Sequence, residues 1–252
     1  MKIYFYLRRT EDWKNVEYEK LQAFNVERLS VEGVRIWWDK VSSVRWFDFR
    51  AEMKRIAMSS WKLPILFMPP DEIFKLLEDD DFVIPTDDDD WYHPDLNRLI
   101  TENIEDAEYA EWNPGVIQTA FHCNFHDWFR CHKETASCGF VIKGSLLRRM
   151  DPSKRRVLLR GHTEASRYSL ECNAVMKKWE QFNWSMYNWH FGSISAIGMS
   201  RGWEAEVENL FPKRKLPPLP SKYEWCRPQY EDFKSLIESM KFRAGLPKMK
   251  LL

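Results

Sequence analysis

The chain has 252 residues, enough for one large core, and a formal net charge of zero. No overall field therefore favours binding to nucleic acid or to an anionic membrane. Hydrophobic residues make up 44% of the chain and charged residues 30%, as in ordinary folded proteins. No window approaches the roughly 18 apolar residues of a membrane span. We therefore expect no nucleic-acid partner and no transmembrane segment.

The N-terminus and the cysteines indicate the compartment. Residues 1–9 run from apolar to basic, which is the reverse of a secretory signal. Five cysteines are an odd number, and their spacing suggests no disulfide framework. These features predict a soluble, cytoplasmic protein in a reducing compartment.

The first ninety residues alternate strand-like and helix-like patterns. Short runs of branched and aromatic residues predict strands at 2–7, 31–38, 64–68 and 82–86. Helical spacing of apolar residues predicts helices at 49–61 and 71–77.

Further along the chain the alternation continues. A helix should begin near Pro94, because proline is well tolerated in a first helical turn. Strands are expected at 116–125 and 139–142, the longest helix at 163–180, and a short amphipathic helix near 230–242. Strands interleaved with helices predict the α/β class.

Two runs of aspartates flank the strand predicted at 82–86. The first acidic run is residues 79–81; the second acidic run is residues 87–90, followed by Trp91. Like charges about 5 Å apart repel by roughly 3 kcal/mol at an effective dielectric near 20, and a hard divalent cation removes that conflict. Ligands of open α/β sheets bind beyond the carboxyl ends of strands. We interpret the first run as a solvated turn. The second run has apolar and aromatic neighbours, which favour a metal or ligand role for it over a helix-capping loop.

Residues 83–91, an apolar strand followed by Asp-x-Asp-Asp and an aromatic residue, resemble the DXD motif of glycosyltransferases with the GT-A fold. The pattern is most similar to small bacterial and viral rhamnosyltransferases and capsid or capsule glycosyltransferases. The resemblance covers about residues 1–200. It implies a GT-A-like single domain over 1–210, with a mixed, mostly parallel central sheet flanked by helices. The donor half would be about 1–90 and the acceptor half about 91–210, with a basic, proline-containing extension over 211–252 packing on the domain.

The same resemblance implies roles for individual residues. Asp87 would contact the donor ribose or the metal shell, and Asp88 shares this role because the register of four aspartates is ambiguous by one. Asp89 would be the principal ligand of Mn²⁺ or Mg²⁺, which bridges the two donor phosphates in the family, and Asp90 would be a second ligand or would support the ligands from behind. His190 would supply a further metal ligand, with a packed surface histidine as the alternative.

Two arginines and one carboxylate complete the predicted site. Arg8 and Arg9 close the first strand and would hold a base or phosphate of the donor, although exposed arginines are common at strand ends. An inverting enzyme also needs a general base. Asp127 is favoured because it follows a predicted strand end, over three other downstream carboxylates, Glu134, Glu164 and Glu171. Whether the reaction inverts or retains configuration stays open.

The predicted function is that of a metal-dependent glycosyltransferase of the hexosyltransferase type. It would move a hexose or deoxyhexose from a nucleoside-diphosphate sugar to a glycan or protein-linked acceptor. One alternative is a metal-dependent phosphoryl-transfer enzyme or nuclease that uses the same aspartates. Another is a non-catalytic carbohydrate-binding module, in which some of the 13 tryptophans form the binding surface. The histidines and cysteines between 122 and 138 match no standard zinc-finger spacing.

Overall fold

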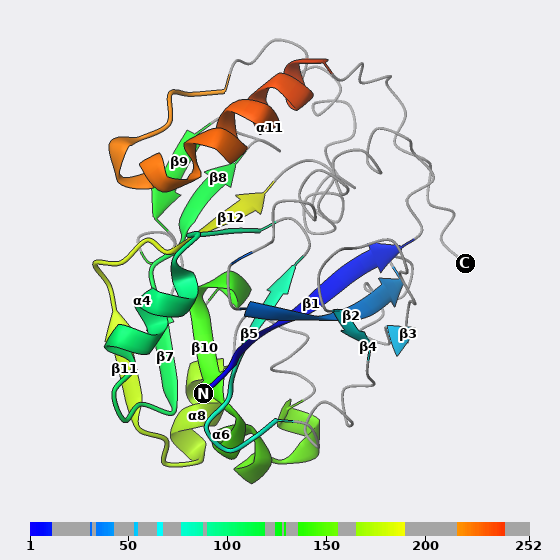
Figure 1. Cartoon of the computed structure of the whole chain (residues 1–252), viewed down its shortest axis with the longest axis vertical. Coiled ribbons are helices and arrows are strands. Elements are labelled where there is room, and N and C mark those ends of the chain that lie inside the picture. Colours follow the sequence, from blue (N-terminus) through cyan, green and yellow to red (C-terminus); the bar gives the residue numbers. More distant parts are fainter. Residues whose placement is uncertain are drawn as a thin grey trace.

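In the computed structural model of the chain, the described residues are 1–11, 31, 34–42, 53–54, 65–67, 77–87, 90–118, 124–127, 129, 136–155, 165–189 and 216–239. Within them, eight strands form a main sheet in the order β11-β7-β10-β5-β1-β2-β3, with β4 paired to β2 (Figure 1). The strands are β1 (Ile3–Glu11), β2 (Val34–Ser42), β3 (Met53–Lys54), β4 (Ile65–Phe67), β5 (Phe82–Asp87), β7 (Tyr109–Trp112), β10 (Phe140–Lys143) and β11 (Met176–Trp179).

The centre of the main sheet is parallel. β1 pairs in parallel with β2 and β5, and β4 pairs in parallel with β2. β10 is antiparallel to both β5 and β7, so β7 runs in the same direction as β5. The carboxyl ends of β1, β2, β4, β5 and β7 therefore meet at one edge, which we call the carboxyl edge.

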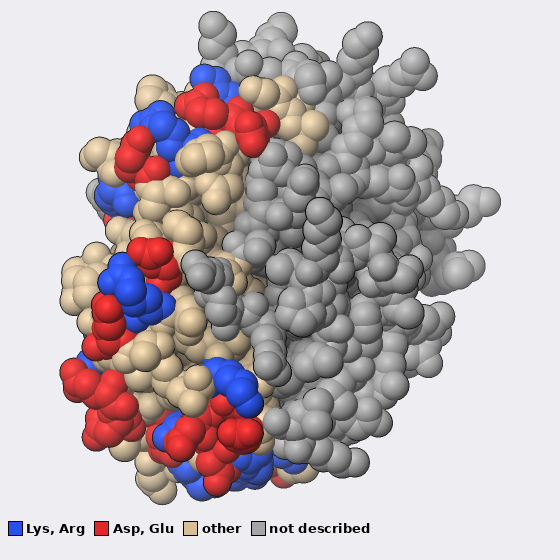
Figure 2. Space-filling model, viewed as in Figure 1, with Lys and Arg blue, Asp and Glu red and all other residues tan. Residues whose placement is uncertain are grey.

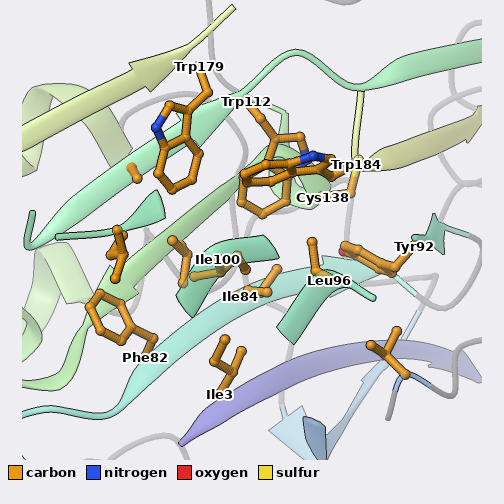
Figure 3. Close-up of a cluster of buried hydrophobic side chains, with 14 of the residues drawn as sticks. Ile3, Phe82, Ile84, Tyr92, Leu96, Ile100, Trp112, Cys138, Trp179 and Trp184 are labelled. Carbon is orange, nitrogen blue, oxygen red and sulfur yellow. The ribbon is translucent and has the colours of Figure 1, made fainter. Parts of the chain in front are cut away.

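Helices cover both faces of the main sheet, because successive residues of a strand point to opposite sides. Phe5 of β1 lies in one buried cluster, which we call the first cluster, and Tyr6 lies in another, which we call the second cluster. Helix α4 (Leu96–Asn103) packs in the first cluster, which Figure 3 shows. Helices α6 (Gly144–Arg149) and α8 (Ala165–Glu171) pack in the second. The predicted α/β class, with a mixed, mostly parallel sheet flanked by helices, is confirmed.

A second, smaller sheet was not anticipated from the sequence. In the described part of the chain it has the strand order β6-β12-β8-β9. Its strands are β6 (Trp91–Tyr92), β8 (Gly115–Gln118), β9 (Asn124–Asp127) and β12 (Ser185–Trp189). A short 3₁₀ turn, η1 (Ser137–Gly139), precedes β10.

The C-terminal segment, which we define as residues 216–239, packs on the small sheet. It contains the 3₁₀ turn η3 (Ser221–Cys226) and helix α11 (Arg227–Ser239), which lies alongside β8 and β9 in Figure 1. The Phe125 ring of β9 stacks on Tyr223, with centroids 6.1 Å apart, and also contacts Tyr230. The helix predicted near 230–242 is thereby confirmed, beginning slightly earlier, whereas the domain boundaries stay predictions.

Most strands of the parallel core lie where the sequence predicts them, with β1 and β2 extending further than expected, and α4 follows Pro94 as expected. The strand predicted at 116–125 is wrong, because the chain reverses there and β8 pairs antiparallel with β9. No glycine or proline interrupts 116–125, so composition did not mark the reversal.

Two predicted helices are also wrong. The helix predicted at 163–180 ends at Glu171, because Asn173 adopts a left-handed backbone (φ 53°) that asparagine tolerates. The chain then forms β11 beside β7. Within 49–61, residues 53–54 form β3 opposite β2, so strand pairing overrides the helical spacing. The rest of 49–61, and residues 71–76, lie outside the described residues.

The first acidic run is only in part the solvated turn that the sequence suggests. Asp79 and Asp80 are exposed in a turn, and Lys143 forms an ion pair with Asp80 at 2.9 Å. Asp81, however, is buried. Its carboxylate accepts hydrogen bonds from the backbone amides of Lys2 (2.8 Å) and Glu78 (3.1 Å). Asp81 therefore ties β1 to the turn that precedes β5.

Charged side chains of both signs lie on the described part of the face in Figure 2. Many charged side chains form pairs, such as Arg98 with Glu102 at 3.0 Å. Within the described residues, no helix is long and apolar enough to cross a membrane. The described cysteines Cys138, Cys172 and Cys226 are free thiols.

Candidate functional site

The carboxyl edge brings one basic and two acidic residues into a single row. Arg8 of β1 is in register with Asp87 of β5 on one side and with Asp39 of β2 on the other. Strands of a sheet are about 4.8 Å apart, and residues in register share a face. Asp39, Arg8 and Asp87 therefore occupy neighbouring positions on β2, β1 and β5. Arg8 and Arg9 do not close the first strand as predicted, because β1 continues to Glu11, and β2 likewise continues past Asp39 to Ser42.

Asp39 was missed in the sequence analysis. It directly follows the strand predicted at 31–38, so the strand-end rule that singled out Asp87 applies to it equally. Asp39 is a single carboxylate and so does not stand out in the sequence, whereas the aspartates at 87–90 form a run.

The second acidic run is the connection between the two sheets. β5 ends at Asp87 in the main sheet, and β6 begins at Trp91 in the small sheet. The chain thus leaves the carboxyl edge through these aspartates. Asp88 and Asp89 lie outside the described residues.

Asp90 is fully buried, with 0% of its surface exposed. Its Oδ2 lies 3.4 Å from the backbone nitrogen of Asp87 and 3.5 Å from Oγ1 of Thr86. The Thr86 hydroxyl also lies 3.1 Å from the carbonyl oxygen of Asp87, so its single hydrogen serves one acceptor at a time. Burying a carboxylate is costly without compensating partners. The Asp90 carboxylate is therefore directed inward, towards the end of β5.

The two residues after Asp90 fix the run from opposite sides. Tyr92 points into the first cluster (Figure 3). Its ring lies 4.4 Å from that of Phe5. Burial, followed by the nearby Cys138 and Asp90, raises the pKa of Tyr92 well above its usual range. Its phenol therefore stays neutral. Trp91 is fully buried on the other side and meets the ring of Phe233 edge-on at 5.3 Å.

The small sheet directs β12 towards the second acidic run. β12 is antiparallel to β6, with Met186 opposite Trp91 and Ser185 opposite Tyr92. The residues of β12 after Met186 therefore run towards the aspartates that precede Trp91. β12 ends at Trp189, and His190, the next residue, lies outside the described residues. Its metal-ligand role stays a prediction.

Asp127 lies at the far side of the small sheet. It is in register with Gly115, which is in register with Met186 and so with Trp91. Three strand spacings separate Asp127 from Trp91, or about 14 Å. Its Oδ1 accepts hydrogen bonds from Lys222 Nζ and the Tyr223 hydroxyl, each at 2.5 Å.

These contacts tie the C-terminal segment to β9. Burial, and then the hydrogen bond to Asp127, raise the pKa of Tyr223, so its hydroxyl stays protonated and donates. The role of Asp127 as general base stays a prediction.

The donor types at the second acidic run fit a hard divalent cation. Asp87 and Asp90 offer carboxylate oxygens, and oxygen ligands are what Mn²⁺ and Mg²⁺ prefer. Among the described residues, no group of three His, Cys, Asp or Glu side chains is arranged to hold a metal ion. The remaining predicted ligands, Asp88, Asp89 and His190, fall outside that part of the chain.

A scan against protein-family models finds no match, and a search of curated proteins finds none either. Aligned solved structures include residues 1–349 of TarS from S. aureus, at 10% identity and TM-score 0.38, covering 95% of this chain and 70% of that chain. The glycosyltransferase GlyE from Streptococcus pneumoniae TIGR4 aligns at 10% identity and TM-score 0.37, covering 92% and 62%. A protein described as a glucose-1-phosphate thymidylyltransferase from Bacillus anthracis, in complex with sucrose, aligns at 10% identity and TM-score 0.40, covering 88% and 99%. Similarity at this level is too low to transfer an activity.

Proposed function

We propose that this chain is a glycosyltransferase that moves a hexose or deoxyhexose from a nucleoside-diphosphate sugar to a glycan or protein-linked acceptor, with Mn²⁺ or Mg²⁺ at the second acidic run. One observation carries the proposal. The run that resembles a DXD motif in sequence lies at the carboxyl edge of parallel strands, between two sheets, with Asp90 directed inward. This edge is where α/β sheets bind ligands.

The aspartates would hold the cation, and Arg8 would contact the donor. A bound divalent cation would neutralise charge on the nucleoside diphosphate as it leaves. Asp87 is placed to contribute because it ends β5 in register with Arg8. The burial of Asp90 supports a fixed rather than a mobile carboxylate, as a binding site requires. Arg9, the next residue of β1, is the second candidate for this contact.

A general base remains part of the proposal. Asp127 would serve in this role through Oδ2, because Lys222 and Tyr223 both donate to its Oδ1. An acceptor hydroxyl must come within hydrogen-bond reach of a base. Asp127→Asn, measured for turnover and for stability, separates a catalytic role from a tie to the C-terminal segment.

The runner-up is a metal-dependent phosphoryl-transfer enzyme. It requires several carboxylates that converge at one place, and Asp39 of β2 is in register with Arg8, which is in register with Asp87. A carbohydrate-binding surface of tryptophans has less support, since several described tryptophans are buried core residues, namely Trp91, Trp112, Trp179 and Trp184.

The test is a thermal-shift panel of UDP, GDP, dTDP and CMP, each with Mn²⁺ or with EDTA. A ligand at a hundred times its dissociation constant adds about 2.7 kcal/mol of stability. We expect one nucleotide to stabilise the wild type only with Mn²⁺, and Asp89→Ala to abolish the shift. Asp80→Ala is the matched control, because Asp80 belongs to the first acidic run at the other end of β5.

The outcomes separate the two candidate functions. Stabilisation by Mn²⁺ alone, with no added effect of any nucleotide, would overturn the transferase and favour the phosphoryl-transfer enzyme. A nucleotide shift that survives Asp89→Ala would remove the second acidic run from the site.

A further inference from the structure

β6, the strand that continues the second acidic run, has few backbone constraints of its own. It is two residues long and forms the edge of the small sheet among the described residues. Its register with β12 consists of two residue pairs. A backbone hydrogen bond from His93 to the Trp184 carbonyl oxygen, at 2.8 Å, follows the strand. The side chains of Trp91 and Tyr92 add the packing contacts that hold it.

Those two side chains are held by different parts of the molecule. Tyr92 packs in the first cluster of the main sheet, against Phe5. Trp91 points to the other face of β6 and meets Phe233 of α11. Both Trp91 and Phe233 have 0% of their surface exposed. One side of the strand is thus fixed by the main core and the other by the C-terminal segment.

The C-terminal segment contacts strands at both sides of the small sheet. Tyr223 contacts β8 at Gly115, where an added Cβ would lie 2.5 Å from Tyr223 Cε1, and β9 at Asp127. Phe233 contacts β6 at Trp91. Tyr223 in η3 and Phe233 in α11 therefore fix the segment to β8 and β9 on one side of the small sheet and to β6 on the other.

We propose that Phe233 is a positioning residue for the second acidic run, which it reaches through Trp91. Trp91 directly follows Asp90 in the chain, so a shift of the indole moves the buried carboxylate. Asp127, Lys222 and Tyr223 anchor the other end of the segment and set where Phe233 falls. This inference rests on the proposed function, because it assigns to the C-terminal segment the task of holding the cation ligands in place.

Loss of Phe233 should leave the main sheet intact. Tyr92 would still hold β6 to the first cluster, while Trp91 would face a cavity and could change its position. Residues that orient metal ligands typically change metal affinity or activity by about 10- to 100-fold when they are replaced. The expected signature is therefore a loss of affinity larger than the loss of stability explains.

The experiment compares Phe233→Ala with Leu146→Ala. Leu146 is equally buried but lies in the second cluster, on the far face of the main sheet. The probe is whichever of UDP, GDP, dTDP and CMP gives the largest Mn²⁺-dependent shift in the wild type. Its dissociation constant with Mn²⁺ is measured by calorimetry, at a temperature where both variants are folded.

We expect both variants to unfold at lower temperature, but only Phe233→Ala to weaken nucleotide binding with Mn²⁺, by about 10- to 100-fold. Phe233→Leu should recover most of the affinity. If Phe233→Ala does not fold, the same comparison can be made at Trp91, the partner of Phe233 in the contact. Trp91→Phe is then the test variant and Trp179→Phe is its control.

Wild-type affinity in Phe233→Ala would overturn the positioning role while leaving the proposed function intact. Equal weakening in Leu146→Ala would also overturn it, because the effect would then be one of general stability. A wild type that binds no nucleotide with Mn²⁺ would instead overturn the proposed function, and this inference with it.

Discussion

The two acidic runs lie at opposite ends of the same strand and have different surroundings. The first precedes β5, and its exposed members pair with basic residues, Asp80 with Lys143 and Asp79 with Arg148. The second follows β5 at the carboxyl edge, ends in the buried Asp90 and leads into the small sheet. Composition does not distinguish the two runs. Strand direction and the aromatic residues that follow the second run do.

The largest difference should appear when one charge is removed from each run. Asp90→Asn keeps the size of the side chain and an oxygen that can accept from the Asp87 amide. We expect Mn²⁺-dependent nucleotide binding to weaken more than about 100-fold, because a ligand charge is lost. Without ligand, the unfolding midpoint should stay the same or rise, because a buried carboxylate is costly.

Asp81→Asn is the counterpart in the first run. It should lower the unfolding midpoint by weakening the bonds to the amides of Lys2 and Glu78, and leave nucleotide affinity unchanged. Equal loss of nucleotide affinity in the Asp81 and Asp90 variants, measured by calorimetry, would break the distinction between the runs.

A pair of glycines sharpens the comparison at the level of packing. A Cβ on Gly115 would meet the Tyr223 ring, and a Cβ on Gly144 would meet the backbone oxygen of Glu78 beside the first run. Each change to alanine should destabilise the fold by about 1–3 kcal/mol through overpacking, measured by urea unfolding. Only Gly115→Ala should also weaken Mn²⁺-dependent nucleotide binding, because it displaces the C-terminal segment. Unchanged affinity in Gly115→Ala would uncouple that segment from the site.

Two arginines give a smaller contrast. Arg8 is in register with Asp87 at the carboxyl edge, whereas Arg148 bonds to Asp79 at the other end. Arg8→Ala should weaken nucleotide binding about tenfold, or about 1.4 kcal/mol, the scale of one charged hydrogen bond. Arg148→Ala should lower stability alone. Loss of binding in the Arg148 variant would contradict the assignment of the donor to the carboxyl edge.

The smallest effect is expected from the pH dependence of the first run. The hydrogen bond and charge of Lys143 lower the pKa of Asp80 below its usual 3.8. A carboxylate with a depressed pKa contributes stability that is present above the unfolded value and is lost as pH falls through the folded value. Asp80→Asn should therefore leave the unfolding midpoint at pH 7 nearly unchanged. Below pH 3.8 it should flatten the fall of the midpoint. A clearly lower unfolding midpoint of Asp80→Asn at pH 7 would show that Asp80 does more than form an exposed ion pair.

The sequence predicted the parallel core because its strands are short apolar runs with clear ends. β5 and β4 read as strands from composition alone, and the aspartates after β5 marked the carboxyl edge. β11 and β3 could not be predicted, because each forms by pairing with another strand, β11 with the distant β7 and β3 with the preceding β2. Helical spacing in those segments was real but was overridden by pairing.

Parts of the candidate site could not be predicted from the sequence for a similar reason, because they depend on contacts between distant segments. Asp39 joins Arg8 and Asp87 only through the register of β1 with β2 and β5. Phe233 meets Trp91 across 142 positions of sequence, and nothing in either local pattern indicates the contact. Strand-end carboxylates are visible in a sequence, whereas the residues that hold them in position depend on the assembled sheets.

The most direct test of the central claim is a crystal structure with MnCl₂ and the nucleotide selected by the thermal-shift panel. Anomalous scattering from manganese would locate the cation. We predict one peak within coordination distance of the aspartates at 87–90, with the diphosphate bridged to it and Arg8 on the donor side. A peak at the first acidic run, or nucleotide bound away from the carboxyl edge, would contradict the claim.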